Sequence, residues 1–270
     1  MIIEGATAMT GHNDWERLNQ EREQTLINDF PYERLKVPGS EALAEWERLK
    51  ARGAGYPLLI GDDKALVRIA ENQHMGKRPV EQIVEAAVGI EHPSSLQTYR
   101  IAQLEKVRAV FAELAVERND APSLEDDLAL DVEVGEWPDH PGDPLGLTVA
   151  IDLETGRPLE AVNVVIIPTQ QGALAPAFLK LGGWNDYPPA EFVVAALQDW
   201  QRRFGAELIG VSGDVLNIRV ARRPSDREEA MALAREQFEF CNDLVFQGTE
   251  TLSRLAAILM ESDWWYFWWD

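Results

Sequence analysis

The chain has 270 residues, of which 46% are hydrophobic and 26% charged, and its formal net charge is −21 at pH 7. This composition is typical of a folded globular protein and excludes an intrinsically disordered one. The negative charge argues against nonspecific binding to nucleic acid or to an anionic membrane, because both depend on Lys and Arg to neutralise phosphate. No stretch reaches the roughly 18 apolar residues of a membrane span, and the opening MIIEGATAMTGHND is not expected to be a secretory signal.

Residues 1–120 are predicted to form a mostly helical N-terminal region. The apolar run YPLLIG at 56–61 predicts a strand, and Asp62 or Asp63 can cap the helix that follows it. The strand is the only one expected in this region. Apolar residues at helical spacing predict helices at about 15–30, 40–50, 63–72, 80–88 and 95–117.

The middle of the chain is strongly acidic and rich in proline. Residues 121–160 contain eleven acids and one base, together with Pro122, Pro138, Pro141 and Pro144. Such a composition is typical of a linker or a long surface loop. We therefore predict an acidic linker at 121–144 that separates the N-terminal region from a domain at 145–270.

The pattern changes to alternating strands and helices after residue 145. LTVAIDL and LEAVNVVIIP predict a hairpin around ETGRP, and AELIGVSGDVLNIRVA predicts a second hairpin with its turn at 212–214. A helix is expected between them, from Pro189 to Phe204. Ser225 with Glu228, and then Thr249, are expected to cap two further helices before a final strand. The order ββαββααβ predicts an α+β fold with an antiparallel or mixed sheet backed by helices.

The chain ends in DWWYFWWD, which places six aromatic rings in eight positions. Each large ring buries on the order of 150–250 Å², so exposure of this run would create an apolar patch of the size that drives association. Alternation along a strand directs Trp264, Tyr266 and Trp268 to one face and the intervening rings to the other. Because both faces need cover, we expect an inner strand.

Several stretches of residues 145–270 resemble a known family. They are GGWNDYPP at 182–189, FGAE at 204–207, SGDVLNIRVARRP at 212–224, EEAMALAREQFEFCNDLVFQG at 228–248 and FWWD at 267–270. Together and in this order they resemble the bacterial family called domain of unknown function 4253. The resemblance implies a bacterial, cytosolic protein with a two-part layout, and it implies no activity. The single cysteine, which excludes an intrachain disulfide, also fits the cytoplasm.

The signatures of common enzymes and cofactor sites do not occur. There is no GxGxxG after a strand, no GxxxxGK[ST], no HExxH and no CxxC. All four histidines are isolated in sequence and lie outside 145–270, which argues against a zinc site or a Ser-His-Asp triad there. We therefore predict no catalytic residue, no metal site and no cofactor. The histidines are His12, His74, His92 and His140.

Five residues are candidates for a binding site. Trp184, Asn185 and Asp186 follow a Gly-Gly pair and precede a helix, where the main chain can approach a ligand; alternatively, the polar pair caps the helix and Trp184 fills the core. Asp243 lies at a helix C-terminus, where an acid is unfavourable, so it indicates either a cap for the next turn or a ligand contact. Asp270 is expected to converge on the same pocket.

Three functions from different classes remain open. The first is a non-catalytic protein-interaction module, immunity or antitoxin-like, whose negative charge masks a basic partner. The second is a hydrolase or transferase of unfamiliar type that uses Asp186, Asp214, Asp243 or Cys241 in a cleft. In this alternative Cys241 is disfavoured, because nearby negative charge raises the pKa of a thiol. The third is a small-ligand sensor with an aromatic pocket closed by the C-terminal tail.

Overall fold

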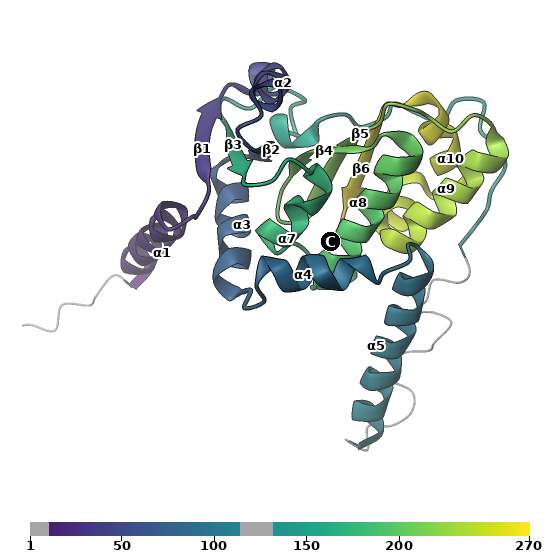
Figure 1. Cartoon of the computed structure of the whole chain (residues 1–270), viewed down its shortest axis with the longest axis horizontal. Helices are drawn as coiled ribbons and strands as arrows, with labels where there is room; N and C mark the ends of the chain where they lie inside the picture. The colour runs from purple at the N-terminus through teal and green to yellow at the C-terminus, as the bar shows by residue number, and fades with distance from the viewer. Residues whose placement is uncertain (1–10, 114–131) are drawn as a thin grey trace, which may run out of the picture.

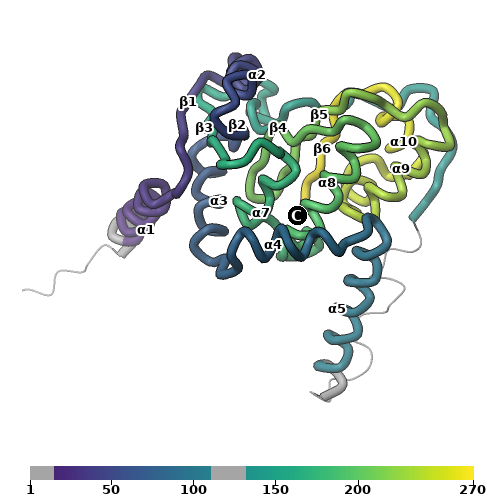
Figure 2. Tube along the Cα trace, viewed as in Figure 1, coloured from purple at the N-terminus to yellow at the C-terminus, as the bar shows by residue number. Residues whose placement is uncertain are grey.

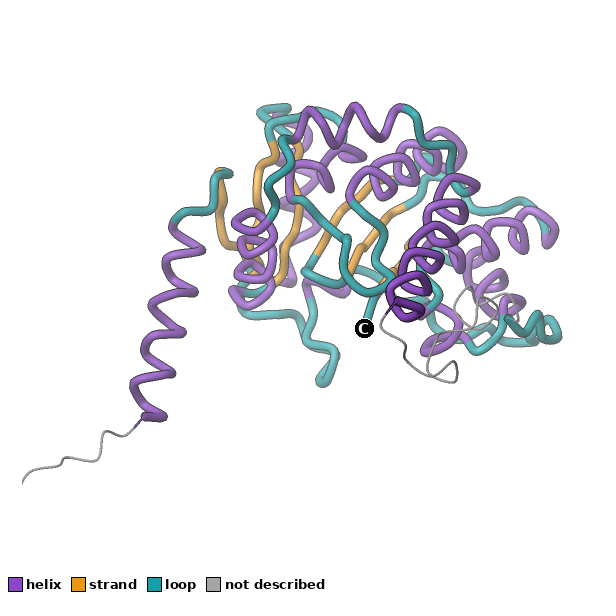
Figure 3. The backbone as a smooth tube through the Cα atoms, turned by 90° about the horizontal axis from the view of Figure 1, so that it is seen from below, coloured by secondary structure: helices purple, strands orange, loops and turns teal. Residues whose placement is uncertain are grey.

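The computed structural model describes residues 11–113 and 132–270, so the end of the helix predicted at 95–117 and the first part of the acidic linker predicted at 121–144 lie outside the described residues. It confirms the α+β fold, with a six-stranded mixed sheet and a mostly helical stretch before the C-terminal strands and helices. Figure 1 shows two helices, α1 and α5, projecting away from the rest of the molecule. In Figure 3 the strands lie side by side in one layer, with α1 extending away from it.

The sheet combines strands from both sides of the acidic segment. Its order is β1-β3-β2-β4-β5-β6, and every neighbouring pair is antiparallel except β2 and β4, which are parallel. Figure 2 shows β3, which is coloured teal, between the purple and blue N-terminal strands. The strands are β1 (Glu33–Val37), β2 (Tyr56–Gly61), β3 (Val162–Ile167), β4 (Glu207–Val211), β5 (Val215–Arg219) and β6 (Trp264–Trp268).

The helices form where apolar residues recur at helical spacing. In α8 this spacing buries Val193, Leu197, Trp200 and Phe204 on the face toward the core. The α-helices are α1 (Gly11–Asn28), α2 (Ala42–Arg52), α3 (Asp63–Met75), α4 (Val80–Val88), α5 (Ser94–Glu113), α7 (Ala175–Leu179), α8 (Ala190–Phe204), α9 (Arg227–Phe240) and α10 (Leu252–Glu261). The short helical turns are η1 (Gly39–Glu41), η2 (Thr148–Ala150), η3 (Gly172–Leu174) and the π-helical η4 (Leu244–Thr249).

The predicted hairpin of LTVAIDL and LEAVNVVIIP does not form as two paired strands. The turn around ETGRP is present, since Leu159 donates to the Ala150 carbonyl at 2.9 Å, but its first arm is the turn η2 rather than a strand. The reason is the buried amide of Asn217 in β5, which accepts a hydrogen bond from Val149 N–H at 3.0 Å. The second arm, β3, pairs with β1 and β2 instead.

Two of the predicted helix caps lie at different residues. Asp226, not Ser225, caps α9 by accepting from Glu229 N–H at 2.9 Å. Thr251, not Thr249, caps α10. Strand β1 was also not expected, because its sequence ERLKV is charged and short, as is typical of an edge strand.

The C-terminal strand is at the edge of the sheet, not inside it, so the expected inner strand is wrong. Strand β6 pairs with β5 on one side and with no other strand of the described residues. Its inner face is nonetheless fully covered, with Trp265, Phe267 and Trp269 each 2% exposed or less. The ring of Trp200 in α8 stacks on Phe267, with centroids 5.3 Å apart and planes 12° apart. Trp200 of α8 and Phe240 of α9 therefore cover this face of β6, although the strand lies at the edge of the sheet.

Phe267→Ala should lower the free energy of unfolding by about 3–5 kcal/mol, because it opens a cavity among packed rings. The matched control is Phe246→Ala, whose ring is 55% exposed and should cost less than about 1.5 kcal/mol. Urea unfolding followed by circular dichroism measures both. Equal losses for the two variants would contradict the organising role of the inner face of β6.

Candidate functional site

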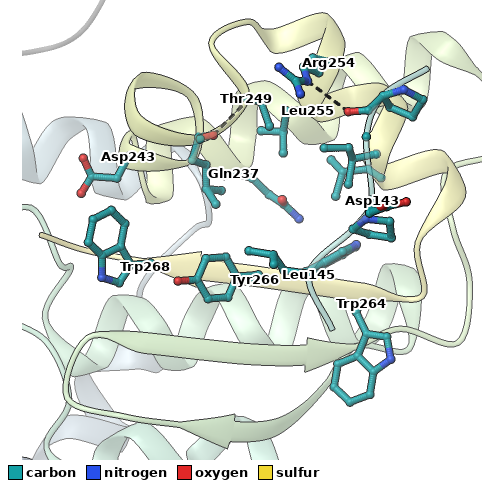
Figure 4. A pocket seen from close by; sticks show the side chains of 18 of the residues that line it. Asp143, Leu145, Gln237, Asp243, Thr249, Arg254, Leu255, Trp264, Tyr266 and Trp268 are labelled. Carbon is teal, nitrogen blue, oxygen red and sulfur yellow. Dashed lines mark hydrogen bonds between the residues drawn. The ribbon is translucent and has the colours of Figure 1, made fainter. Parts of the chain in front are cut away.

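A cavity of about 330 Å³ lies beside β6. Three parts of the chain line it: strand β6, the helices α9, η4 and α10, and the segment 141–145 (Figure 4). Most of the wall is apolar, and a few polar side chains converge on it, which is the usual composition of a ligand site. The residues that matter for its chemistry are Asp143, Leu145, Gln237, Asp243, Arg254, Leu255, Trp264, Trp265, Tyr266 and Trp268.

The aromatic wall comes from the C-terminal strand. Trp264, Tyr266 and Trp268 alternate with the core-facing rings and are half-buried. Burial raises the pKa of Tyr266 to about 12, so its hydroxyl stays protonated at neutral pH. These three side chains border the cavity together with Trp265 from the core-facing side of the strand.

The side chain of Gln237 is buried in the cavity wall without a full set of partners. Gln237 lies on α9 and is only 1% exposed, and its Nε2 has no hydrogen-bond partner within the described part of the chain. Figure 4 shows its amide pointing into the middle of the cavity. A buried amide group without a partner costs about 1–3 kcal/mol, so a ligand that accepts this hydrogen bond recovers that energy.

Two carboxylates lie on the cavity wall, and its one cation is already held. Asp143 is exposed, and Asp243 is half-buried. The guanidinium of Arg254 donates from Nε to the Pro141 carbonyl at 3.1 Å, and its Nη1 lies 3.5 Å from Glu250 Oε2. Both oxygens of Asp243 also accept hydrogen bonds, from Gln247 Nε2 at 2.8 Å and from Asp270 N–H at 3.2 Å. Two carboxylates against one paired guanidinium leave the cavity wall with a net negative charge, which favours a cationic group nearby.

Three of the five predicted binding residues are joined by hydrogen bonds. The side chain of Asn185 donates to the Asp270 carbonyl at 2.7 Å, and Asp270 N–H donates to Asp243 Oδ2 at 3.2 Å. This network holds the C-terminus against the end of α9. Of the three residues only Asp243 also lines the cavity.

The other two predicted residues do not line the cavity. Trp184 packs edge-on against Tyr187, with centroids 5.9 Å apart, in a turn closed by their main chains. Asp186 is exposed, and its carbonyl accepts from Arg100 at 3.1 Å. Asn185 has a φ of 45° in this turn, a left-handed conformation that asparagine tolerates better than most residues.

Sequence reasoning missed Gln237, although a signal for it was present. The apolar stripe of α9 runs through Ala230, Leu233, Ala234 and Phe238, and Gln237 lies four residues after Leu233, on the same face. A glutamine on the buried face of an amphipathic helix requires a partner. The sequence alone does not show that this partner is absent.

Cys241 is a buried thiol rather than an exposed one. It is 0% exposed, and its Sγ donates to the Trp268 carbonyl at 3.0 Å. Burial, together with the negative charge of Asp243, raises the pKa of Cys241 to about 12. The thiol therefore stays protonated at neutral pH and acts as a structural donor to β6.

Because the thiolate is the reactive form, the folded protein should react slowly with a thiol reagent between pH 7 and pH 9. Denaturant should accelerate the reaction by at least about 100-fold, since unfolding restores both access and an ordinary pKa. Only one cysteine is present, so a thiol reagent that releases a coloured group measures the reaction rate of Cys241 directly by absorbance. Rapid labelling of the folded protein would contradict the buried position.

A second polar cluster joins the N-terminal region to α9. The carboxylate of Glu236 accepts from Arg203 at 2.8 Å and from Trp200 Nε1, and it lies 3.1 Å from His92 Nε2. Burial raises the pKa of Glu236, but the hydrogen bonds from His92 and Arg203 outweigh it, so the pKa lies below its ordinary value of 4.5. The isolated position of His92 in the sequence gave no indication of this contact.

Glu236→Gln should lower the free energy of unfolding at pH 7 by about 1–3 kcal/mol, because charge-assisted hydrogen bonds are lost. A carboxyl group with a depressed pKa stabilises the fold above its ordinary pKa and loses this effect as pH falls. The difference from the parent chain should therefore shrink below about pH 4.5. Urea unfolding at a series of pH values measures it, with the exposed Glu228→Gln as control. A difference independent of pH would contradict the depressed pKa.

Fold and site together define an α+β protein whose last strand borders a ligand-sized cavity. Residues 163–270 match the family model described as Domain of unknown function (DUF4253). The chain therefore carries a DUF4253 domain, which confirms the resemblance seen in the sequence motifs. No match was found among curated proteins, and none among solved structures.

The matched region contains most of the cavity wall but not all of the sheet. It begins within β3 and includes β4, β5 and β6, whereas β1, β2 and the segment 141–145 precede it. Within the described part of the chain, no group of three or more His, Cys, Asp or Glu side chains could hold a metal ion. Over the same residues, no helix has both the length and the apolar character needed to cross a bilayer.

Proposed function

We propose that the protein is a non-catalytic binding protein and that its DUF4253 domain holds the ligand in the cavity beside β6. The observation that carries this proposal is the buried amide of Gln237, which lines the cavity and has an unpaired Nε2. Buried polar groups in folded proteins are almost always paired. A binding site is one place where such an unpaired group is useful, because the ligand supplies the partner.

The contacts of the acids and the thiol support binding rather than catalysis. Asp214 pairs with Arg68 at 3.0 Å, Asp243 accepts from Asp270 N–H, and Cys241 stays protonated. A general base or nucleophile needs a free, suitably activated group. These groups instead hold turns and the C-terminus in place.

The partner in this proposal is a basic protein, as for an immunity or antitoxin-like factor. Its cationic group would lie near Asp143 and Asp243, and the net charge of −21 would draw it toward the chain. Complementary charge of this kind mainly increases the association rate and selects the partner.

A second candidate function is that of a small-ligand sensor. The observation that favours it is the size of the cavity, about 330 Å³, which lies within the range of ~300–1,000 Å³ that small-molecule sites occupy. In this case the aromatic wall of β6 would hold a planar or apolar ligand.

A thermal-shift screen with small cationic and neutral amides, including N-acetyl-lysine N-methylamide, tests the binding proposal. At ten times its Kd a ligand stabilises the fold by about 1.4 kcal/mol, which should raise the Tm of a chain of this length by about 2–3 °C. Gln237→Met should abolish the shift, because methionine fills the same space without an N–H. The same variant should leave the unliganded protein as stable as its parent, or more stable.

The matched control is Gln201→Met, an exposed position on α8 that should keep the full ligand shift. Two results would contradict the proposal: the absence of any stabilising amide, or ligand shifts that the Gln237 variant retains in full.

A further inference from the structure

The cavity lies along the free edge of β6 rather than over one face. It is lined by Trp265 from the inner face of the strand and by Trp264, Tyr266 and Trp268 from the outer face. Side chains from opposite faces border one space only where that space runs past the edge of the strand. Figure 4 agrees, since Gln237 and Leu255 lie on one side of β6 and the green strands lie on the other.

The register of β5 and β6 shows which main-chain groups face this edge. Trp265 lies opposite Ile218 and Phe267 opposite Leu216 in an antiparallel pair without a register shift. Beyond both ends the pattern continues, because Val220 N–H donates to the Asp263 carbonyl at 2.8 Å and Trp269 N–H donates to the Asp214 carbonyl at 3.1 Å. Hydrogen-bonded and non-hydrogen-bonded pairs alternate in such a ladder.

It follows that Trp265 and Phe267 bond to β5, whereas the main-chain groups of Trp264, Tyr266 and Trp268 point to the free edge. At one end, the hydroxyl of Ser262 binds both Trp264 N–H, at 2.9 Å, and the Trp264 carbonyl, at 2.8 Å. At the other end, the Cys241 thiol donates to the Trp268 carbonyl.

Between these two blocked ends, the N–H and carbonyl of Tyr266 have no partner among the described residues. A donor and an acceptor on one residue of an edge strand form the unit that binds an added strand. An extended peptide reproduces this unit, because a single residue supplies both the carbonyl and the N–H that Tyr266 requires. The cavity therefore has a main-chain recognition element as well as aromatic walls.

We propose that the ligand is a short extended segment of a basic protein, which adds to the free edge of β6 and pairs its main chain with Tyr266. This inference rests on the binding function proposed above. Asp143 and Asp243, which both line the cavity, would attract lysine or arginine side chains in the segment. A side chain of the segment would also bring a polar group to Gln237.

A library of blocked pentapeptides with lysine at both ends is the probe, and calorimetry with the full chain measures binding. The tightest peptide is then made again with a single N-methyl group at each residue in turn. Methylation of the residue that pairs with Tyr266 should weaken binding at least tenfold. Methylation of the residue next to it, whose N–H points away from β6, is the control and should change affinity by less than threefold.

The protein side is tested with Tyr266→Pro and Tyr266→Val. Proline removes one N–H that faces the free edge, so the β5 pairing is kept, and both variants lose the ring. The proline variant should bind at least tenfold more weakly than the valine variant. If the proline variant does not fold, the N-methyl series decides the question.

Two results would overturn the strand-addition proposal while the binding function stands. One is a set of N-methyl peptides that all bind equally. The other is the failure of every peptide in the library to bind, while small amides still raise the Tm of the parent chain and do not raise that of the Gln237 variant. If neither peptides nor amides bind in a manner that depends on Gln237, the binding function falls together with the strand-addition proposal.

Discussion

The packing of aromatic rings against the inner face of β6 is the interaction on which the C-terminal half depends. Trp200 from α8 stacks on Phe267, and Phe240 from α9 meets the same ring edge-on with centroids 5.3 Å apart. Each such ring buries about 150–250 Å² and also favours a specific geometry. Because α8, α9 and β6 must all meet at these rings, the strand is fixed at the edge of the sheet with one face sealed.

The same constraint leaves the other face and the free edge of β6 available. The sheet ends at this strand, so the main chain of Tyr266 needs a partner that residues 11–113 and 132–270 do not provide. Gln237, on the neighbouring α9, likewise has an unpaired Nε2. Unpaired polar groups from the strand and from the helix therefore border one cavity, and this coincidence is the physical basis for assigning a binding role.

The sequence predicted helices and turns well where a single local signal, such as helical spacing of apolar residues or a turn sequence, was strong. The helix at 80–88 and the 212–214 turn between β4 and β5 have the expected bounds, because neither depends on distant residues. The pairing of β3 with β1 and β2 was not predictable in this way, since it joins segments more than a hundred residues apart. Asn185, Asp243 and Asp270, which the sequence singled out as binding residues, hydrogen-bond to one another, and their role in binding stays a prediction. The cavity was not predictable, because it depends on which side chains remain unpaired after packing.

Amide hydrogen exchange of β6, followed by NMR, tests the central claim most directly. The account predicts that Trp265 and Phe267 exchange only on global unfolding, because their N–H groups bond to β5. The Tyr266 amide, which faces the cavity, should exchange at least about 100-fold faster in the free protein. Equal protection of all three amides would show that the edge of β6 is already paired, and would contradict a strand with one sealed face and one open edge.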